Sequence, residues 1–396
     1  MTKETAFARG SVRSLAVLAV AGMMGHGLAM TVTGPVLPTI MVAFGIRETA
    51  VGVLLAAGSL GFMTGCLLGG LATDELGLKP VITTAWLSVA ISLVGFALSS
   101  SYPLLVLTYT LVGISSGLVE TGLNVLPAQI GGGAGTMNLV HMGYCVGALS
   151  APLIAGFVLS SGGGWRLPYW LTAIVPIVLT VRGLTMPMPA APRQQANHVQ
   201  RQPLFTLLRH PLVLLSALAL LFYVAAEMSI SNWVVLFMVQ RFNLPPLQAS
   251  GALTVFWGLV LVGRLLQGPL ASKFSLPGLI VAHCIAMGVS ILGLSQARSS
   301  LVAYIFLVTV GLAASGIYPD VMIYTNRRYQ RQVGAITGVL SMTAAAGSFA
   351  FQPIVGRVAE TYGLPVGFFG LAGCMFTAGI SFLPIWLDQR HDRRDH

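Results

Sequence analysis

Three carboxylic acids, Glu120, Glu227 and Asp320, lie inside stretches of sequence that are otherwise apolar. Each stretch is long enough to cross a bilayer, where a charged group at the centre costs roughly 2.5–3.5 kcal/mol on insertion scales. Such acids usually face the interior of a helix bundle or a wet cavity and mark a substrate or proton path. Their types and positions therefore predict a transporter that moves a polar solute, protons or both.

The composition indicates which elements position these acids. Hydrophobic residues make up 55% of the 396 residues and charged residues only 8%, whereas soluble domains contain about 25% charged residues. Apolar runs of about 20 residues, the length of a membrane-spanning helix, recur along the chain. We expect an all-α membrane protein with twelve transmembrane helices, at roughly 14–37, 50–72, 80–99, 103–126, 137–160, 168–186, 212–239, 249–272, 277–296, 301–324, 334–358 and 365–387.

The net charge of +10 indicates topology rather than a nucleic-acid partner. With the N-terminus in the cytoplasm, 15 Lys and Arg residues fall in cytoplasmic segments and 5 in outer segments. The positive-inside rule then places both termini in the cytoplasm. We expect a multi-pass monomer in a bacterial-type cytoplasmic (inner) membrane, with the lipid bilayer, a small-molecule solute and protons as its partners and no nucleic acid.

No sequence pattern of an enzyme accompanies the acids. The chain has no Gly-rich phosphate loop, metal-ligand cluster or catalytic-triad pattern, and its four cysteines are far apart without CxxC spacing. We therefore expect no catalytic residue, no metal and no cofactor, with a proton gradient as the energy source.

A polar, proline-rich break divides the chain into two parts. Residues 187–210 hold four prolines and several basic residues, which is typical of a flexible linker. They separate an N-terminal six-helix half, 1–186, from a C-terminal half, 211–396. Similar residues recur in the two halves at an offset near 200, in the pairs Gly156/Gly356, Pro152/Pro353 and Glu120/Asp320. Parallel six-helix repeats with a site at their interface are the major facilitator architecture.

One loop and two helix segments extend this resemblance. After the second run, Gly70, Asp74, Gly77 and Lys79 match the major facilitator loop signature G-x-x-x-D-R-x-G-R-K, although Glu75 and Leu78 replace its basic residues. A Gly-rich turn with an exposed Asp is the alternative interpretation. Residues 117–124 (GLVETGLN) and 138–148 (NLVHMGYCVGA) resemble the fucose:proton symporter family. Within that family the chain is most similar to bacterial glucose/mannose:proton symporters, through the C-terminal residues 222–227 (FYVAAE), Asn232, 256–258 (FWG), Gly263 and Arg264.

The resemblance implies proton-coupled uptake of a monosaccharide or a similar polar solute by alternating access. One departure concerns the first run: fucose-type members carry an Asp there, whereas residues 33–38 contain no acid and His26 is the ionisable residue of that run. Two alternatives remain open. A Met-rich, aromatic cavity would suit a proton-driven exporter of drugs or metabolites. A non-transporting receptor or scaffold is the other alternative, but it would give no reason for the buried acids.

We assign proton coupling to Glu120, His141 and Glu227. Glu120 and Asn124 are four residues apart and share a helix face, and His141 follows Asn138 by three residues on one face of the next run. A structural carboxylate and a packing histidine are the alternatives for Glu120 and His141, and an internal hydrogen-bond anchor is the alternative for Glu227.

Solute binding is assigned to a set from both halves. A helix face with an acid, a phenol and a hydroxyl, at Glu227, Tyr223 and Ser231, suits a hydroxyl-rich ligand. Trp257 could stack on the apolar face of a sugar; lipid or core packing is its alternative. The predicted solute-binding residues are Asn124, Asn138, Tyr223, Glu227, Asn232 and Trp257.

Arg264 and Asp320 are predicted to form a gating or structural ion pair. Both lie roughly 10–14 Å inside the ends of their helices, and pairing relieves the cost of two buried charges. A last motif, Gly143-x-x-x-Gly147, is either the helix-five motif of drug exporters or a surface for close helix packing.

Overall fold

The computed structural model describes residues 9–131, 134–188, 207 and 209–392. Within these residues, twelve helical segments are long and apolar enough to cross a membrane, which confirms the predicted all-α, twelve-span fold. The linker predicted at 187–210 lies mostly outside the described residues, so the domain boundary stays a prediction.

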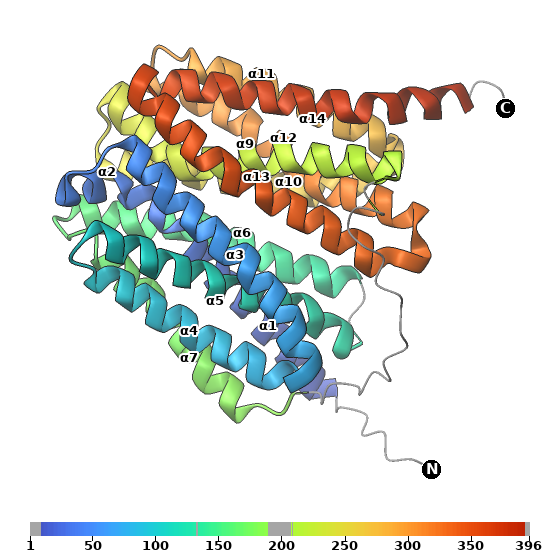
Figure 1. The fold of residues 1–396 in the computed structure, drawn as a ribbon, viewed down its shortest axis with the longest axis horizontal. Coiled ribbons are helices and arrows are strands. Elements are labelled where there is room, and N and C mark those ends of the chain that lie inside the picture. Colours follow the sequence, from blue (N-terminus) through green and yellow to red (C-terminus); the bar gives the residue numbers. More distant parts are fainter. Residues whose placement is uncertain (1–8, 132–133, 189–206, 208, 393–396) are drawn as a thin grey trace.

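The first six spans pack together as one group and the last six as another, drawn blue to green and yellow to red in Figure 1. The first group consists of α1 (Arg9–Thr31) continued by α2 (Thr33–Phe44), α3 (Glu48–Leu76), α4 (Leu78–Leu98), α5 (Tyr102–Gln129), α6 (Ala134–Ser160) and α7 (Leu167–Thr185). The second consists of α9 (Pro211–Phe242), α10 (Pro246–Lys273), α11 (Leu276–Ser295), α12 (Ser300–Arg328), the short η1 (Gln330–Gln332), α13 (Val333–Tyr362) and α14 (Leu364–Asp392).

Proline and glycine set two boundaries in the first group. The first span is broken after Thr31, because Pro35 lacks the N–H that would bond to the carbonyl of Thr31. The segment predicted as a loop after the second span is helical as far as Leu76, and only Gly77 separates α3 from α4. Gly77 has a φ of 84°, which a residue with a Cβ adopts at a cost. The neighbouring Lys79 donates a hydrogen bond of 3.1 Å to the carbonyl of Leu184 and so joins α4 to the end of α7.

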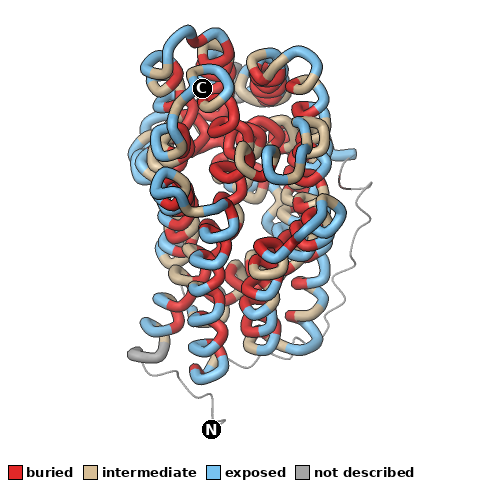
Figure 2. The backbone as a smooth tube through the Cα atoms, turned by 90° about the vertical axis from the view of Figure 1, so that its left-hand side faces the viewer, coloured by how far each residue is buried: buried red, intermediate tan, exposed pale blue. Residues whose placement is uncertain are grey.

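The outer faces of the bundle are apolar, as a lipid environment requires. Buried residues lie toward the inside of the bundle in Figure 2, and exposed residues lie on the outward faces and at the ends. Many outward residues are large and hydrophobic, among them Leu67, Ile91, Phe157, Val181 and Ile380. Such a surface would be unfavourable in water, so the bilayer completes the fold.

Close packing between α1 and α6 accounts for the small residues of α6. A Cβ added at Gly143 would lie 2.5 Å from the carbonyl oxygen of Val20, and one at Gly147 would clash with the backbone of Met24. The Gly143-x-x-x-Gly147 motif therefore forms a helix-packing surface, as small-xxx-small motifs do in membranes.

We call the end of the bundle where α1 begins and α14 ends the terminal end, and the other end the opposite end. The two groups of helices are joined at the opposite end. At the opposite end, Arg47 lies 3.4 Å from Glu360, Glu360 accepts a hydrogen bond from the backbone of Thr49, and Gln240 donates to Glu48. A Cβ at Gly52 would lie 2.6 Å from the carbonyl oxygen of Gln352. Figure 1 shows α3 and α13 closer together here than at the terminal end.

Candidate functional site

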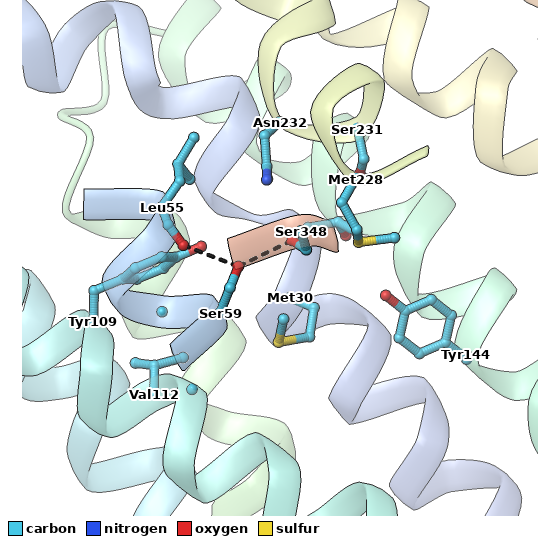
Figure 3. Close-up of a pocket in the computed structure, with 13 residues that line it drawn as sticks. Met30, Leu55, Ser59, Tyr109, Val112, Tyr144, Met228, Ser231, Asn232 and Ser348 are labelled. Carbon is cyan, nitrogen blue, oxygen red and sulfur yellow. Dashed lines mark hydrogen bonds between the residues drawn. The ribbon is translucent and has the colours of Figure 1, made fainter. Parts of the chain in front are cut away.

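A cavity lies between the two groups of helices, behind this closure. Its lining comes from α1, α3, α5 and α6 of the first group and from α9 and α13 of the second (Figure 3). The lining residues are Met30, Thr31, Leu55, Gly58, Ser59, Tyr109, Val112, Gly113, Tyr144, Met228, Ser231, Asn232 and Ser348. None of these carries a charge, and about half present a hydroxyl or amide group.

Two serines hold the cavity wall together across the groups. Ser59 and Ser348 lie 3.0 Å apart through their hydroxyl oxygens, and Ser59 also lies 3.1 Å from the carbonyl of Leu55, to which it donates. On the other side of the cavity, the hydroxyl of Tyr144 and the amide of Asn232 point inward (Figure 3). The cavity therefore offers hydroxyl and amide partners beside the apolar side chains of Met30 and Met228.

Glu120 lies deeper in the first group, in a cluster with two histidines. Its Oε2 is 3.4 Å from Nε2 of His26 on α1, and its Oε1 accepts a hydrogen bond of 3.0 Å from Asn124, as their spacing predicted. His141 of α6 interacts electrostatically with both Glu120 and His26. We call His26, Glu120, Asn124 and His141 the acid–histidine cluster.

The cluster does not line the cavity. Glu120 follows Val112 and Gly113, the α5 residues of the cavity wall, by about two helical turns, which places it nearer the terminal end. Tyr144 links the two sites, because it lines the cavity, lies 5.4 Å from the ring of His26 and interacts electrostatically with both Glu120 and Glu227. Asn124 therefore lies outside the cavity in this structure.

The predicted C-terminal site residues form a layer behind the cavity wall. Tyr223, Glu227 and Trp257 are at most 6% exposed, and none of them lines the cavity, while Asn232 does. Trp257 packs edge-on against Tyr144 at 5.4 Å and donates a hydrogen bond of 3.1 Å to Ser231. Trp257 thus supports two wall residues instead of presenting its own face to a solute.

The hydroxyl of Tyr223 has two partners, although it carries one proton. It lies 2.6 Å from Oε1 of Glu227 and 2.9 Å from the carbonyl oxygen of Ala314. The hydroxyl can donate to only one of these two oxygens. The second contact is a full hydrogen bond only when Glu227 is protonated and donates to the hydroxyl oxygen of Tyr223, which then donates to the carbonyl of Ala314. The arrangement therefore suits a neutral carboxyl group at Glu227.

This arrangement predicts the effect of removing the hydroxyl. Tyr223→Phe leaves Glu227 and the Ala314 carbonyl buried without their partner, at about 1–3 kcal/mol. We expect a lower melting temperature in detergent, with Tyr324→Phe as a control because its hydroxyl contacts the surface residue Arg328. Equal melting temperatures for the two variants would contradict the assignment.

The predicted ion pair between Arg264 and Asp320 is wrong. Arg264 turns toward α6, where its Nη1 lies 3.5 Å from the carbonyl of His141 and where it interacts electrostatically with Tyr144 and Glu227. Asp320 instead accepts a hydrogen bond from Gln267, one turn beyond Arg264 on α10. Arg264 and Asp320 were predicted at similar depths, which would permit a pair. Arg264 and Gln267 lie on successive turns of α10, however, and point toward different neighbouring helices.

Asn138 is not brought to the site either. It is exposed, because α6 begins at Ala134 and Asn138 lies in its second turn, at the terminal end. Sequence reasoning also missed His26, Ser59, Ser348 and Tyr144 as site residues. His26 could have been identified because it is an ionisable residue within the first span. Serine and tyrosine are neutral hydroxyl residues, which do not stand out in an apolar run.

The fold and the central cavity between two six-helix groups define a secondary transporter. The model of the Major Facilitator Superfamily matches residues 19–351, and the chain belongs to this family. It is therefore a multi-pass membrane transporter of small solutes and not an enzyme.

Curated relatives are distant but span nearly the whole chain. The mouse sodium-dependent glucose transporter 1A is 23% identical over 90% of this chain and 93% of its own length. Multidrug resistance protein 1 of Bacillus subtilis is 23% identical over 93% of this chain and 94% of its own length. The glucose/mannose transporter GlcP of the same organism is 21% identical over 83% of this chain and 84% of its own length. Among solved structures, a mutant of the nucleoside transporter NupG has a TM-score of 0.81 at 13% identity, covering 94% of this chain and 99% of that one.

Proposed function

We propose that this transporter takes up a small, uncharged, hydroxyl-rich solute, a hexose or a related sugar, together with protons. The observation that carries the proposal is the cavity lining, in which hydroxyl and amide groups stand beside apolar side chains and no charged residue is present. Sugars present hydroxyl groups and apolar ring faces, which such a lining complements. The glucose transporters among the relatives support the same solute class.

The acid–histidine cluster supports proton coupling. Imidazoles exchange protons near neutral pH in many proteins, Glu120 lies beside them, and Tyr144 connects the cluster to the cavity. A solute that contacts Tyr144 can thereby alter the surroundings of Glu120, which is the coupling that symport needs. With the termini in the cytoplasm, the closure at the opposite end makes this the inward-facing state of an alternating-access cycle.

Asn232→Ala tests the cavity as the solute site. Loss of one hydrogen-bonding partner costs about 1–3 kcal/mol, so the affinity should fall roughly tenfold, at 1.4 kcal/mol per decade. Asn326→Ala is the matched control, because Asn326 lies on α12 with its amide on Thr337, outside the cavity. Binding of candidate sugars is measured by calorimetry, and an unchanged affinity for the transported sugar in Asn232→Ala would place the site elsewhere.

The transported solute and the coupling ion are tested together in proteoliposomes. Uptake of labelled hexoses is measured under an imposed proton gradient and, separately, under a sodium gradient. Concentrative hexose uptake driven by the proton gradient is expected. Hexose uptake driven by the sodium gradient alone would contradict proton coupling but would leave the hexose as the transported solute.

A proton-driven drug exporter remains the second candidate. Met30 and Met228 favour it, because thioether side chains adapt to apolar ligands of varied shape, and the chain resembles a multidrug resistance protein. Drug-induced proton release from acidified vesicles, without hexose uptake, would establish the exporter and exclude the sugar importer.

A further inference from the structure

A buried polar cluster lies in the C-terminal group, outside the cavity and away from Glu120. Its centre is Asp320 of α12, which is 1% exposed and accepts a hydrogen bond from Nε2 of Gln267 on α10. His283 of α11 contacts α12 one turn earlier, at Gly316. We call Asp320, Gln267 and His283 the Asp320 cluster.

The position of Gly316 shows that the side chains of Gln267 and His283 meet one turn before Asp320. Gly316 lies one turn before Asp320 on the same face of α12. A Cβ added there would lie 2.6 Å from Oε1 of Gln267 and 2.7 Å from Cε1 of His283. Both side chains therefore press against the α12 backbone beside Asp320, in space that only a glycine leaves free.

The cluster has buried polar atoms without hydrogen-bond partners. Oε1 of Gln267 and Nδ1 of His283 are buried and have no hydrogen-bond partner among the described residues. Asp320 adds a carboxyl group that is a pure acceptor when ionised. Unpaired buried polar groups are costly, so these atoms favour a proton-bearing or positively charged occupant close to Asp320.

No basic side chain within the described part of the chain fills this role. The polar groups seen against this part of α12 are Gln267 from α10 and His283 from α11, with Tyr223 from α9, whose hydroxyl is taken by Glu227 and Ala314. Arg264 faces α6 instead. An ionised Asp320 would therefore be a buried charge without a counter-ion, which proteins avoid by neutralisation or by binding a cation.

We propose that the Asp320 cluster is a second site for a monovalent cation, with a proton on Asp320 as the occupant in the structure described. A protonated Asp320 donates to an acceptor of the cluster that otherwise lacks a donor. Glu120 and Asp320 occupy equivalent positions, 200 residues apart, on α5 and α12. The transporter then binds cations in both halves, at Glu120 and at Asp320, whatever solute it carries.

Infrared difference spectroscopy of the reconstituted protein tests the occupant directly. A protonated carboxyl group gives a C=O stretching band that a carboxylate and an amide do not give. At neutral pH the wild type should show a band that Asp320→Asn lacks and that Glu120→Gln and Asp320→Glu retain. Asp320→Asn should keep its melting temperature within a few degrees, because the amide is neutral and can still contact Gln267.

Binding of radioactive sodium to the purified protein provides the second arm. Sodium binding that Asp320→Asn abolishes, without an Asp320-dependent carboxyl band, supports the cation site with sodium as its occupant. Absence of both signals overturns the proposal. If Asp320→Asn does not fold, Gln267→Leu decides, since loss of the hydrogen bond that Gln267 donates to Asp320 must shift the pH at which the band disappears; an unshifted band overturns the proposal. None of these readouts requires sugar transport, so failure of the proposed function and failure of this site are distinguishable.

Discussion

Replacing Glu120 by Gln should abolish concentrative uptake while exchange of solute across the membrane continues. The amide keeps the shape of the side chain and can still contact Asn124 and His26, but it cannot release a proton. Coupling then fails, although the cavity, whose lining does not include Glu120, is left intact. Accumulation under a fixed proton gradient should fall to the level of empty vesicles, and counterflow should remain within about threefold of wild type, a change of less than 1 kcal/mol.

Glu75→Gln is the matched control for this substitution. Glu75 is exposed near the end of α3, so the same chemical change there should leave both activities unaltered. Wild-type accumulation by Glu120→Gln, measured at the same gradient, would remove Glu120 from the coupling mechanism.

A side chain at position 52 should prevent closure of the opposite end. Gly52 of α3 meets the backbone of α13, where an added Cβ would lie 2.6 Å from the carbonyl oxygen of Gln352 and 3.0 Å from Cα of Pro353. Backbone atoms cannot move aside as a flexible side chain can, so Gly52→Val should hold α3 and α13 apart. Because alternating access needs this closure, transport should fall at least tenfold, which corresponds to about 1.4 kcal/mol.

Gly373→Val on α14 is the control for position 52. A Cβ added at Gly373 meets no neighbouring atom within 4 Å, so this variant should transport normally. The geometry is measured with spin labels at Val42 and Tyr362, which are exposed at the opposite end. Their separation should increase in Gly52→Val only, and an unchanged separation with normal transport would show that this contact is not the closure.

The sequence predicted those features that follow from local spacing. Twelve apolar runs became twelve spans, and the contact between Glu120 and Asn124 follows from four-residue spacing on one helix. Helix packing was one of the two interpretations of Gly143 and Gly147, because small residues one turn apart permit close approach of helices, and the contacts with α1 favour it.

Contacts between helices depend on rotation about each helix axis, which local spacing leaves open. The depth of Arg264 and Asp320 made a pair reasonable, but Arg264 faces α6 and Gln267 contacts Asp320. The approach of His26 to Glu120 brings together residues 94 positions apart. Ser59 and Ser348, which meet across the cavity wall, have no titratable group to mark them among many other serines.

The central claim is that solute and protons enter together, and proton movement during solute entry tests it most directly. Wild-type proteoliposomes in weakly buffered medium receive the transported hexose outside, with no imposed gradient, and the external pH is followed. We predict alkalinisation on hexose addition, abolished by a protonophore and absent in Glu120→Gln. Acidification, or hexose entry without any pH change, would contradict proton-coupled uptake.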